Sequence, residues 1–259
     1  MKYVDAHLHL ADAEYKGQAG IMLEDAKSSD VVALVSNATD YATCLENLKL
    51  RRDNSALVYI ALGIHPWNVN VLREGEIEQT LQLIEDEHAK HNVVAIGEIG
   101  LDCKYETVWD RQLFVFDKML REAEKLGLPV VIHSRGTAEF IISMLPSYNL
   151  KRVLLHWFSH PMPAMGNVMD KGYFITEGPP AVYSSGIRDV VAVTPLTQLL
   201  TETDGPVLFR KAPFNGQATR PSFIREVVRA IAEIKKMSSE DVADQVVRNF
   251  EVFFDVKIL

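Results

Sequence analysis

The sequence predicts one α/β domain, a single (β/α)8 TIM-like barrel that spans residues 1–259. Short apolar runs alternate along the chain with longer helical stretches, and eight such units in about 250 residues is the usual size of this barrel. Several runs are too apolar to leave one face in water, which indicates a buried parallel sheet. A doubly wound open sheet fits the alternation too, but it would not gather polar residues from so many strand ends. We therefore expect a barrel without a linker.

The expected elements follow one another in regular order. The runs predicted as strands are short and rich in Val, Ile and Leu. They cover Tyr3–Leu8, Val31–Ser36, Val58–Ile64, Val93–Ile99, Pro129–His133, Val153–Trp157, Tyr173–Thr176 and Gln198–Glu202. The stretches predicted as helices are Tyr41–Asp53, Glu74–His91, Val108–Leu126, Ala138–Leu145, Pro161–Lys171, Gly186–Thr194, Pro221–Lys236 and Ser239–Phe254.

Composition narrows the class of protein. With 47% hydrophobic residues the chain can bury a large core, yet no uninterrupted apolar run reaches the 18 residues of a membrane span. The first residues lack a basic segment followed by an apolar one, so we expect no secretion signal. Cys44 and Cys103 form no CxxC motif, and we expect reduced thiols in a cytoplasmic protein. Cys103 lies shortly after the predicted strand Val93–Ile99.

Net charge bears on the partner. A formal charge of −8 argues against general coating of nucleic acid. It leaves room for a nucleic-acid substrate that is held by bound cations and a few arginines.

The segment Asp5–His9 reads Asp-Ala-His-Leu-His at the end of the first apolar run. Residues two apart on a strand share a face, so His7 and His9 project together. Imidazole is a common metal ligand, and such a pair can form half of a metal site. Taken alone, the segment is equally consistent with two histidines that merely flank a turn.

Other predicted strands end in polar residues too. These residues are His65, Glu98, Asp102, His133, Arg135, His156, Glu202 and Asp204. In a barrel all the carboxyl ends converge on one mouth, where barrel enzymes keep their chemistry. A lone histidine at a strand end is usually structural. That several strands each deliver one to the same end indicates a metal centre.

Three stretches make the chain similar to the TatD family of metal-dependent hydrolases, within the wider amidohydrolase barrels. They are Asp5–His9, Pro129–Glu139 and Glu202–Pro206. The second stretch fits the family pattern at every fixed position. The resemblance extends from Asp5 to about Phe254.

This resemblance implies a two-metal site. The family's ligand positions fall here on His7, His9, Glu98, His133, His156 and Asp204. His7, His9 and Asp204 would hold the first divalent ion, and His133 and His156 the second. Glu98 would bridge them, since a carboxylate can hold two cations about 3.5–4 Å apart. The donor set suits zinc, manganese or, more weakly, magnesium.

The expectations for other residues are open between two roles. His65 resembles a family position at the rim of the site, where it would contact substrate or support a ligand without binding metal directly. Arg135 could clamp a phosphate or pair with Glu139 four residues on. Lys211 and Arg220 could hold a polyanion or neutralise neighbouring acids.

Five further polar residues carry weaker expectations. Asp102 and Glu202 could orient ligand imidazoles or pair with Arg135. His88 and His91 are expected on a solvated helix face. His160 is expected in a loop near the mouth.

The resemblance implies a deoxyribonuclease of 3′-exonuclease type. DNA would be the substrate, single-stranded or at a strand end, and Asp204 and Glu98 would be catalytic, with Asp204 orienting the metal-activated water and accepting its proton. A first alternative is hydrolysis of an acyl ester or amide, such as a D-aminoacyl-tRNA. A lactonase is a weaker fit because Glu98 stands where such relatives often carry a modified lysine. A remote alternative is a non-catalytic barrel in which metals stabilise a binding protein.

Overall fold

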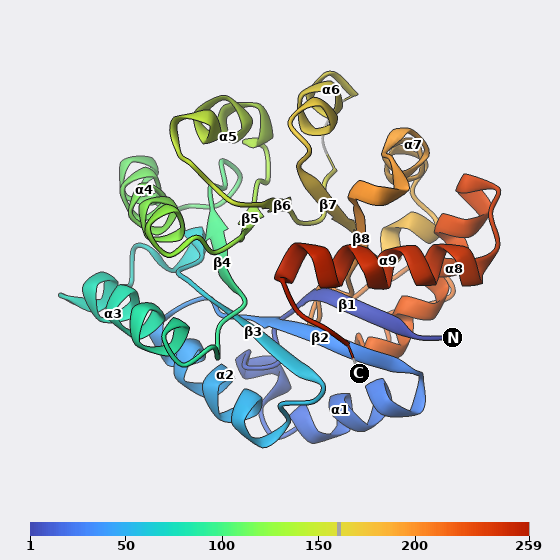
Figure 1. Ribbon diagram of the computed structural model, residues 1–259, viewed down its shortest axis with the longest axis horizontal. Coiled ribbons are helices and arrows are strands. Elements are labelled where there is room, and N and C mark those ends of the chain that lie inside the picture. The colour runs from blue at the N-terminus through green and yellow to red at the C-terminus, as the bar shows by residue number, and fades with distance from the viewer. Residues whose placement is uncertain (160–161, 259) are drawn as a thin grey trace.

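The computed structural model describes residues 1–159 and 162–258. Its eight strands are β1 Tyr3–Leu8, β2 Val31–Asn37, β3 Val58–Leu62, β4 Ala95–Gly100, β5 Val130–His133, β6 Val153–Leu155, β7 Phe174–Glu177 and β8 Leu199–Thr201. Each strand pairs in parallel with the next, in the order β1 to β8. This ring of strands, with helices around it (Figure 1), confirms the predicted (β/α)8 barrel.

The helices of the described residues surround the strands (Figure 1). They are α1 Ala19–Ser28, α2 Tyr41–Asp53, α3 Glu76–His88, α4 Trp109–Leu126, α5 Ala138–Met144, α6 Met162–Asp170, α7 Ser185–Val193, α8 Ile224–Lys235 and α9 Ser239–Phe254. Short 3-10 turns are η1 Ala13–Tyr15, η2 Pro66–Asn68, η3 Leu145–Ser147, η4 Pro179–Val182, η5 Leu196–Gln198 and η6 Pro221–Phe223. None of the helices described is long and apolar enough to cross a membrane.

Helix α9 packs across the amino-terminal end of the barrel. The ring of Phe250 lies 5.9 Å from that of Tyr59, near the start of β3. Phe253 lies 5.2 Å from Phe174, the first residue of β7. Because this end is filled by aromatic side chains, the opposite, carboxyl end is the one left open for a site.

The barrel is closed between β8 and β1 largely by side chains. Thr201 Oγ1 donates to the Val4 carbonyl at 2.7 Å. The Thr203 hydroxyl and amide donate to the buried carboxylate of Asp5 at 2.6 and 3.0 Å. The Asp204 amide donates to the His7 carbonyl at 2.9 Å. These bonds fix His7 and Asp204 side by side.

The sequence prediction missed helix α1. Its buried residues are only Met22, Leu23 and Ala26, and Gly20 lies within its first turn. Because Gly disfavours helix and the apolar stripe is short, the periodic signal is weak.

Six strands end earlier or later than predicted. Strand β3 stops at Leu62 rather than Ile64, β6 at Leu155 rather than Trp157, and β4 continues to Gly100. Strand β8 stops at Thr201 rather than Glu202, and β2 and β7 continue by one residue to Asn37 and Glu177. Beyond β3 and β6 the backbone leaves the ladder as it turns into the mouth. The prediction for His160, and the start of the helix expected from Pro161, lie outside the described residues.

Candidate metal centre

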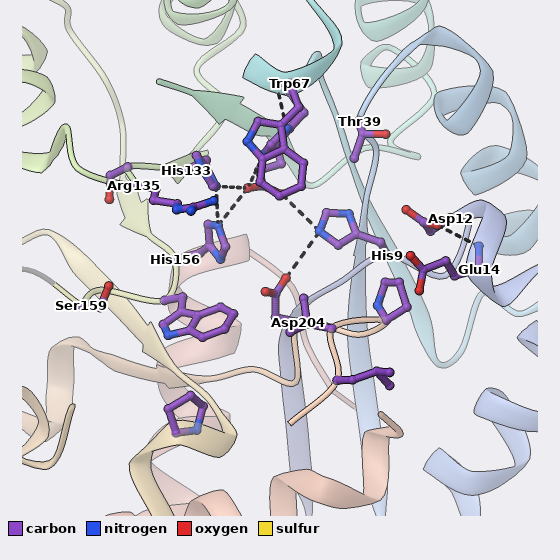
Figure 2. A pocket seen from close by; sticks show the side chains of 18 of the residues that line it. His9, Asp12, Glu14, Thr39, Trp67, His133, Arg135, His156, Ser159 and Asp204 are labelled. Atoms are coloured by element: carbon purple, nitrogen blue, oxygen red, sulfur yellow. Dashed lines mark hydrogen bonds and ion pairs between the residues drawn. The ribbon is translucent and has the colours of Figure 1, made fainter. Parts of the chain in front are cut away.

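Five imidazoles and two carboxylates from six strands meet at the carboxyl end of the barrel. They belong to His7, His9, His65, Glu98, His133, His156 and Asp204. All but His7 line a cavity of about 980 Å³, which Figure 2 shows from close by. The structure therefore brings together all six residues predicted as ligands, and His65 with them.

Glu98 lies at the centre of this cluster. Its Oε2 is 3.2 Å from His7 Nε2 and 3.2 Å from His9 Nε2. Its Oε1 is 2.8 Å from His156 Nε2 and 3.1 Å from His133 Nδ1. The two oxygens thus face two separate groups of imidazole nitrogens, which is the arrangement that a bridging carboxylate needs.

The lack of a side chain at Gly100 allows β4 to bring Glu98 this close to β5. Gly100 has φ of 143°, and a Cβ there would lie 2.0 Å from the carbonyl oxygen of His133. Any larger residue would force the strand ends apart.

Asp204 completes the group around His7 and His9. Its Oδ1 lies 3.5 Å from His7 Nε2 and 3.6 Å from His9 Nε2. The two imidazole nitrogens are themselves only 3.1 Å apart. Nitrogens this close need a shared proton or cation between them, so this donor set fits a divalent ion.

His65 lies deeper than the rim position expected from the sequence. Its side chain is buried, and its Nε2 is 3.2 Å from Glu98 Oε1. Among the residues that the structure describes, it forms with Glu98 and His133 one of three groups whose ligand atoms converge closely enough to hold a metal ion. His65 is therefore a candidate ligand as well as a candidate supporting residue.

Carboxylates stand behind two of the imidazoles. Asp102 Oδ2 lies 2.9 Å from His133 Nε2, and Glu202 Oε2 lies 3.5 Å from His156 Nδ1. Asp102 also lies 3.9 Å from Arg135, so it takes both of the roles left open by the sequence. Glu202 in addition accepts a hydrogen bond from Thr176 at 2.5 Å.

The cluster is strongly polarised. Burial would raise the pKa of Glu98, but the surrounding imidazoles of His156, His65 and His7 hold that pKa well below its usual range. Burial would lower the pKa of His156, but Glu98 and Glu202 hold it well above its usual range. Glu98 is thus anionic, and protons or cations must balance it.

The residues expected to contact substrate divide into two groups. Arg135 and Lys211 line the cavity; Arg135 is 55% exposed. Of the residues described, Arg220 is exposed but not among those lining the cavity. Two hydrogen bonds fix the backbone on either side of Arg220: Tyr15 donates to the Thr219 carbonyl at 2.7 Å, and Asp25 accepts from the Ser222 amide at 2.8 Å. These bonds hold the loop before η6 against η1 and α1.

Two other histidines that the structure describes lie away from the cluster. His88 ends α3 and His91 follows it, and neither is among the residues that line the cavity. Reasoning from sequence missed several residues that do line it, among them Glu14, Thr39 and Trp67. For Trp67 the available signal was its place two residues after His65; nothing in the sequence marks the other two.

The barrel and a cluster of imidazoles about a buried carboxylate are the architecture of a metal-dependent hydrolase. Comparison with known proteins names the family. Residues 4–255 match the family described as TatD related DNase, and the chain belongs to the TatD family of metal-dependent hydrolases.

Relatives match along almost their entire length. An uncharacterized metal-dependent hydrolase of Methanocaldococcus jannaschii, MJ1582, is 32% identical, over 98% of this chain and 97% of its own. The human protein named deoxyribonuclease TATDN3 is 30% identical, over 95% of this chain and 92% of its own. The crystal structure of the TatD homologue YjjV from Escherichia coli superposes with a TM-score of 0.90 at 30% identity, over 98% of each chain.

Proposed function

We propose that this protein is a deoxyribonuclease that hydrolyses phosphodiester bonds at the end of a DNA strand. The observation that carries the proposal is the Glu98 carboxylate between two groups of imidazole nitrogens. That arrangement, at the bottom of an open cavity, fits two divalent ions of the kind that phosphodiester hydrolysis uses. The human relative named a deoxyribonuclease supports the choice of substrate.

The ligands divide by the side of Glu98 that they face. His7, His9 and Asp204 would hold one ion on the side of Glu98 Oε2. His133 and His156 would hold the other on the side of Oε1. So many imidazole donors favour zinc or manganese over magnesium, which prefers oxygen ligands. Bound ions supply Lewis acidity to a phosphate oxygen and lower the pKa of water.

Two side chains of the cavity then act on the substrate. Burial would raise the pKa of Asp204, but the imidazoles of His9, His156 and His7 lower it. Its carboxylate is therefore ionised, and beside its role as a metal ligand it would orient the attacking water and accept its proton. Arg135 presents an exposed guanidinium that can pair with phosphate oxygens and balance their charge.

The preference for a strand end follows from charge. The chain carries a net charge of −8, and Asp12 and Glu14 stand in the cavity wall. Positive side chains in that wall are Arg135 and Lys211, so few phosphates can be gripped at once. We also propose a cytoplasmic location, which the two free thiols, Cys44 and Cys103, support.

The test is hydrolysis by metal-reconstituted protein of single-stranded DNA, RNA, a D-aminoacyl-tRNA and an aryl ester in parallel. We expect DNA to be cleaved, and Glu98→Gln to lower that activity on the order of a thousandfold by removing the central negative charge. Glu139→Gln, at an exposed acid on α5, is the matched control. Preferred hydrolysis of the aminoacyl ester would replace the nuclease assignment. A Glu98→Gln protein with wild-type turnover would remove the metal site from the mechanism.

A further inference from the structure

Two aromatic rings stack at the edge of the cavity. Trp67 in η2 and Tyr105 in the loop after β4 have ring centroids 4.7 Å apart and planes inclined by 14°. Trp67 is 40% exposed and Tyr105 45% exposed. Trp67 lines the cavity, so a large flat apolar surface is left in water beside the polar cluster.

Trp67 is held rigidly against the candidate metal centre. Its indole N–H donates to Asp102 Oδ2 at 2.7 Å, and the same oxygen lies 2.9 Å from His133 Nε2. The indole centroid lies 5.0 Å from the ring of His65 and 5.9 Å from that of His133. Figure 2 shows Trp67 and His133 at the same end of the cavity. A ligand stacked on Trp67 would therefore lie next to the reacting group.

A cation stands beside the same stack. Arg135 Nη1 lies 3.9 Å from Asp102 Oδ2, the oxygen that holds Trp67. One carboxylate thus places an aromatic ring, an exposed guanidinium and a candidate metal ligand around one corner of the cavity. A ring for a base and a guanidinium for its phosphate are the two elements that bind unpaired nucleotides.

We propose that the Trp67–Tyr105 stack binds the base of an unpaired nucleotide whose phosphate lies at the metal centre. The inference rests on the proposed nuclease function and deepens it. In a duplex each base face is covered by its neighbours, so only a base free of the stack can use this surface. Every base has such a face, so the subsite selects single-stranded ends without selecting sequence.

The experiment removes the base and the ring separately. Binding of a single-stranded, phosphorothioate-linked oligonucleotide to metal-loaded protein is measured by fluorescence anisotropy, with an abasic residue at each of the terminal positions in turn. At one position we expect loss of the base to weaken wild-type binding about tenfold, within the range known for base–aromatic stacking. Trp67→Leu should weaken binding of the intact oligonucleotide by a similar factor and be insensitive to base removal there.

Three further variants guard the interpretation. Tyr105→Leu keeps the bond between Trp67 and Asp102 and should show a smaller loss in the same direction. Trp67→Phe keeps a ring without the N–H and should retain most of the base effect. Trp109→Leu is the matched control, because Trp109 in α4 contacts Phe140 and is not among the described residues that line the cavity.

The possible outcomes separate this inference from the proposed function. If the affinity losses from Trp67→Leu and from base removal multiply in the combined measurement, the two act independently and the stack is not a base site. The same follows if removal of the base at no position weakens binding. Hydrolysis of the unmodified oligonucleotide without any base effect keeps the nuclease and removes the subsite. A base effect on binding without hydrolysis keeps the subsite and removes the nuclease. Absence of both binding and hydrolysis overturns the two together.

Discussion

The two sides of the Glu98 carboxylate are built differently. On one side His9 Nδ1 lies 3.1 Å from the Asn37 carbonyl, and Asp204 is tied to the backbone of His7. On the other side Asp102 stands behind His133 and Glu202 behind His156. We call these the seam side, formed by His7, His9 and Asp204, and the acid-backed side, formed by His133 and His156.

The difference shows how each side is held in place. The seam side is positioned by the contacts that close the barrel between β8 and β1, so its geometry is inseparable from the fold. The acid-backed side is positioned by Asp102 and Glu202, which are not among the described residues that line the cavity. A carboxylate behind an imidazole fixes the ring and makes it a stronger donor. Metal affinity on that side can therefore be changed without disturbing the barrel.

The largest expected effect is on the acid-backed side. Asp102→Asn removes the charge behind His133, and we expect metal affinity at one of two sites to fall about 10- to 100-fold. Metal titration by calorimetry, with melting curves to confirm the fold, measures this. Asp110→Asn, at an exposed acid of α4, is the control, and Trp67→Phe tests for an effect through the indole bond. Equal weakening of both sites would mean that the two sides are not independent.

Much of this architecture could be predicted from the sequence, because the ligand positions are local. His7, His9, His133 and Asp204 each follow an apolar run, and the barrel brings such positions together. A supporting role for Asp102 was one of two that the sequence left open, but its full set of contacts depends on the meeting of Trp67 in η2 and His133 at the end of β5. No periodic pattern encodes that meeting.

The same reasoning explains the loop before η6. The sequence shows that Arg220 is basic and lies near the end of the chain's last large loop. Its direction depends on the bonds of Tyr15 and Asp25 to the neighbouring residues, which are far away in sequence. Charge can thus be read from sequence, whereas the surface that a loop presents cannot.

A second effect concerns the pH dependence of metal binding on the seam side. Without metal, burial would lower the pKa of His9, but Asp204 and Glu98 raise it to about 10. Burial lowers the pKa of His65 to about 4, so that imidazole is already neutral at pH 7 and need not be deprotonated to bind a metal ion. A metal ion bound at His9 must displace its proton. Apparent affinity should therefore rise with pH, roughly tenfold per unit below the pKa for each proton displaced.

Chelator competition at pH 6, 7 and 8 measures this dependence. Calorimetry in buffers of different ionisation enthalpy counts the protons released. Release of at least one proton per seam-side metal is expected. An affinity that does not change across this range would show that His9 carries no proton in the metal-free protein.

The smallest expected effect is on DNA binding, and it contrasts one lysine with one arginine, both outside the Glu98 cluster. Lys211 lines the cavity, with its Nζ 5.3 Å from the centroid of the Tyr183 ring, whereas Arg220 is held away from it. Loss of one phosphate contact makes the log–log slope of DNA affinity against salt concentration shallower by about one unit. We expect Lys211→Ala to show that change with a few-fold weaker binding, and Arg220→Ala to match the wild type. Both variants should hydrolyse a small neutral ester as the parent does, because neither contacts the Glu98 cluster. If Arg220→Ala proved the more damaging, DNA would have to cross the loop before η6, and the path from the cavity would need to be redrawn toward α1.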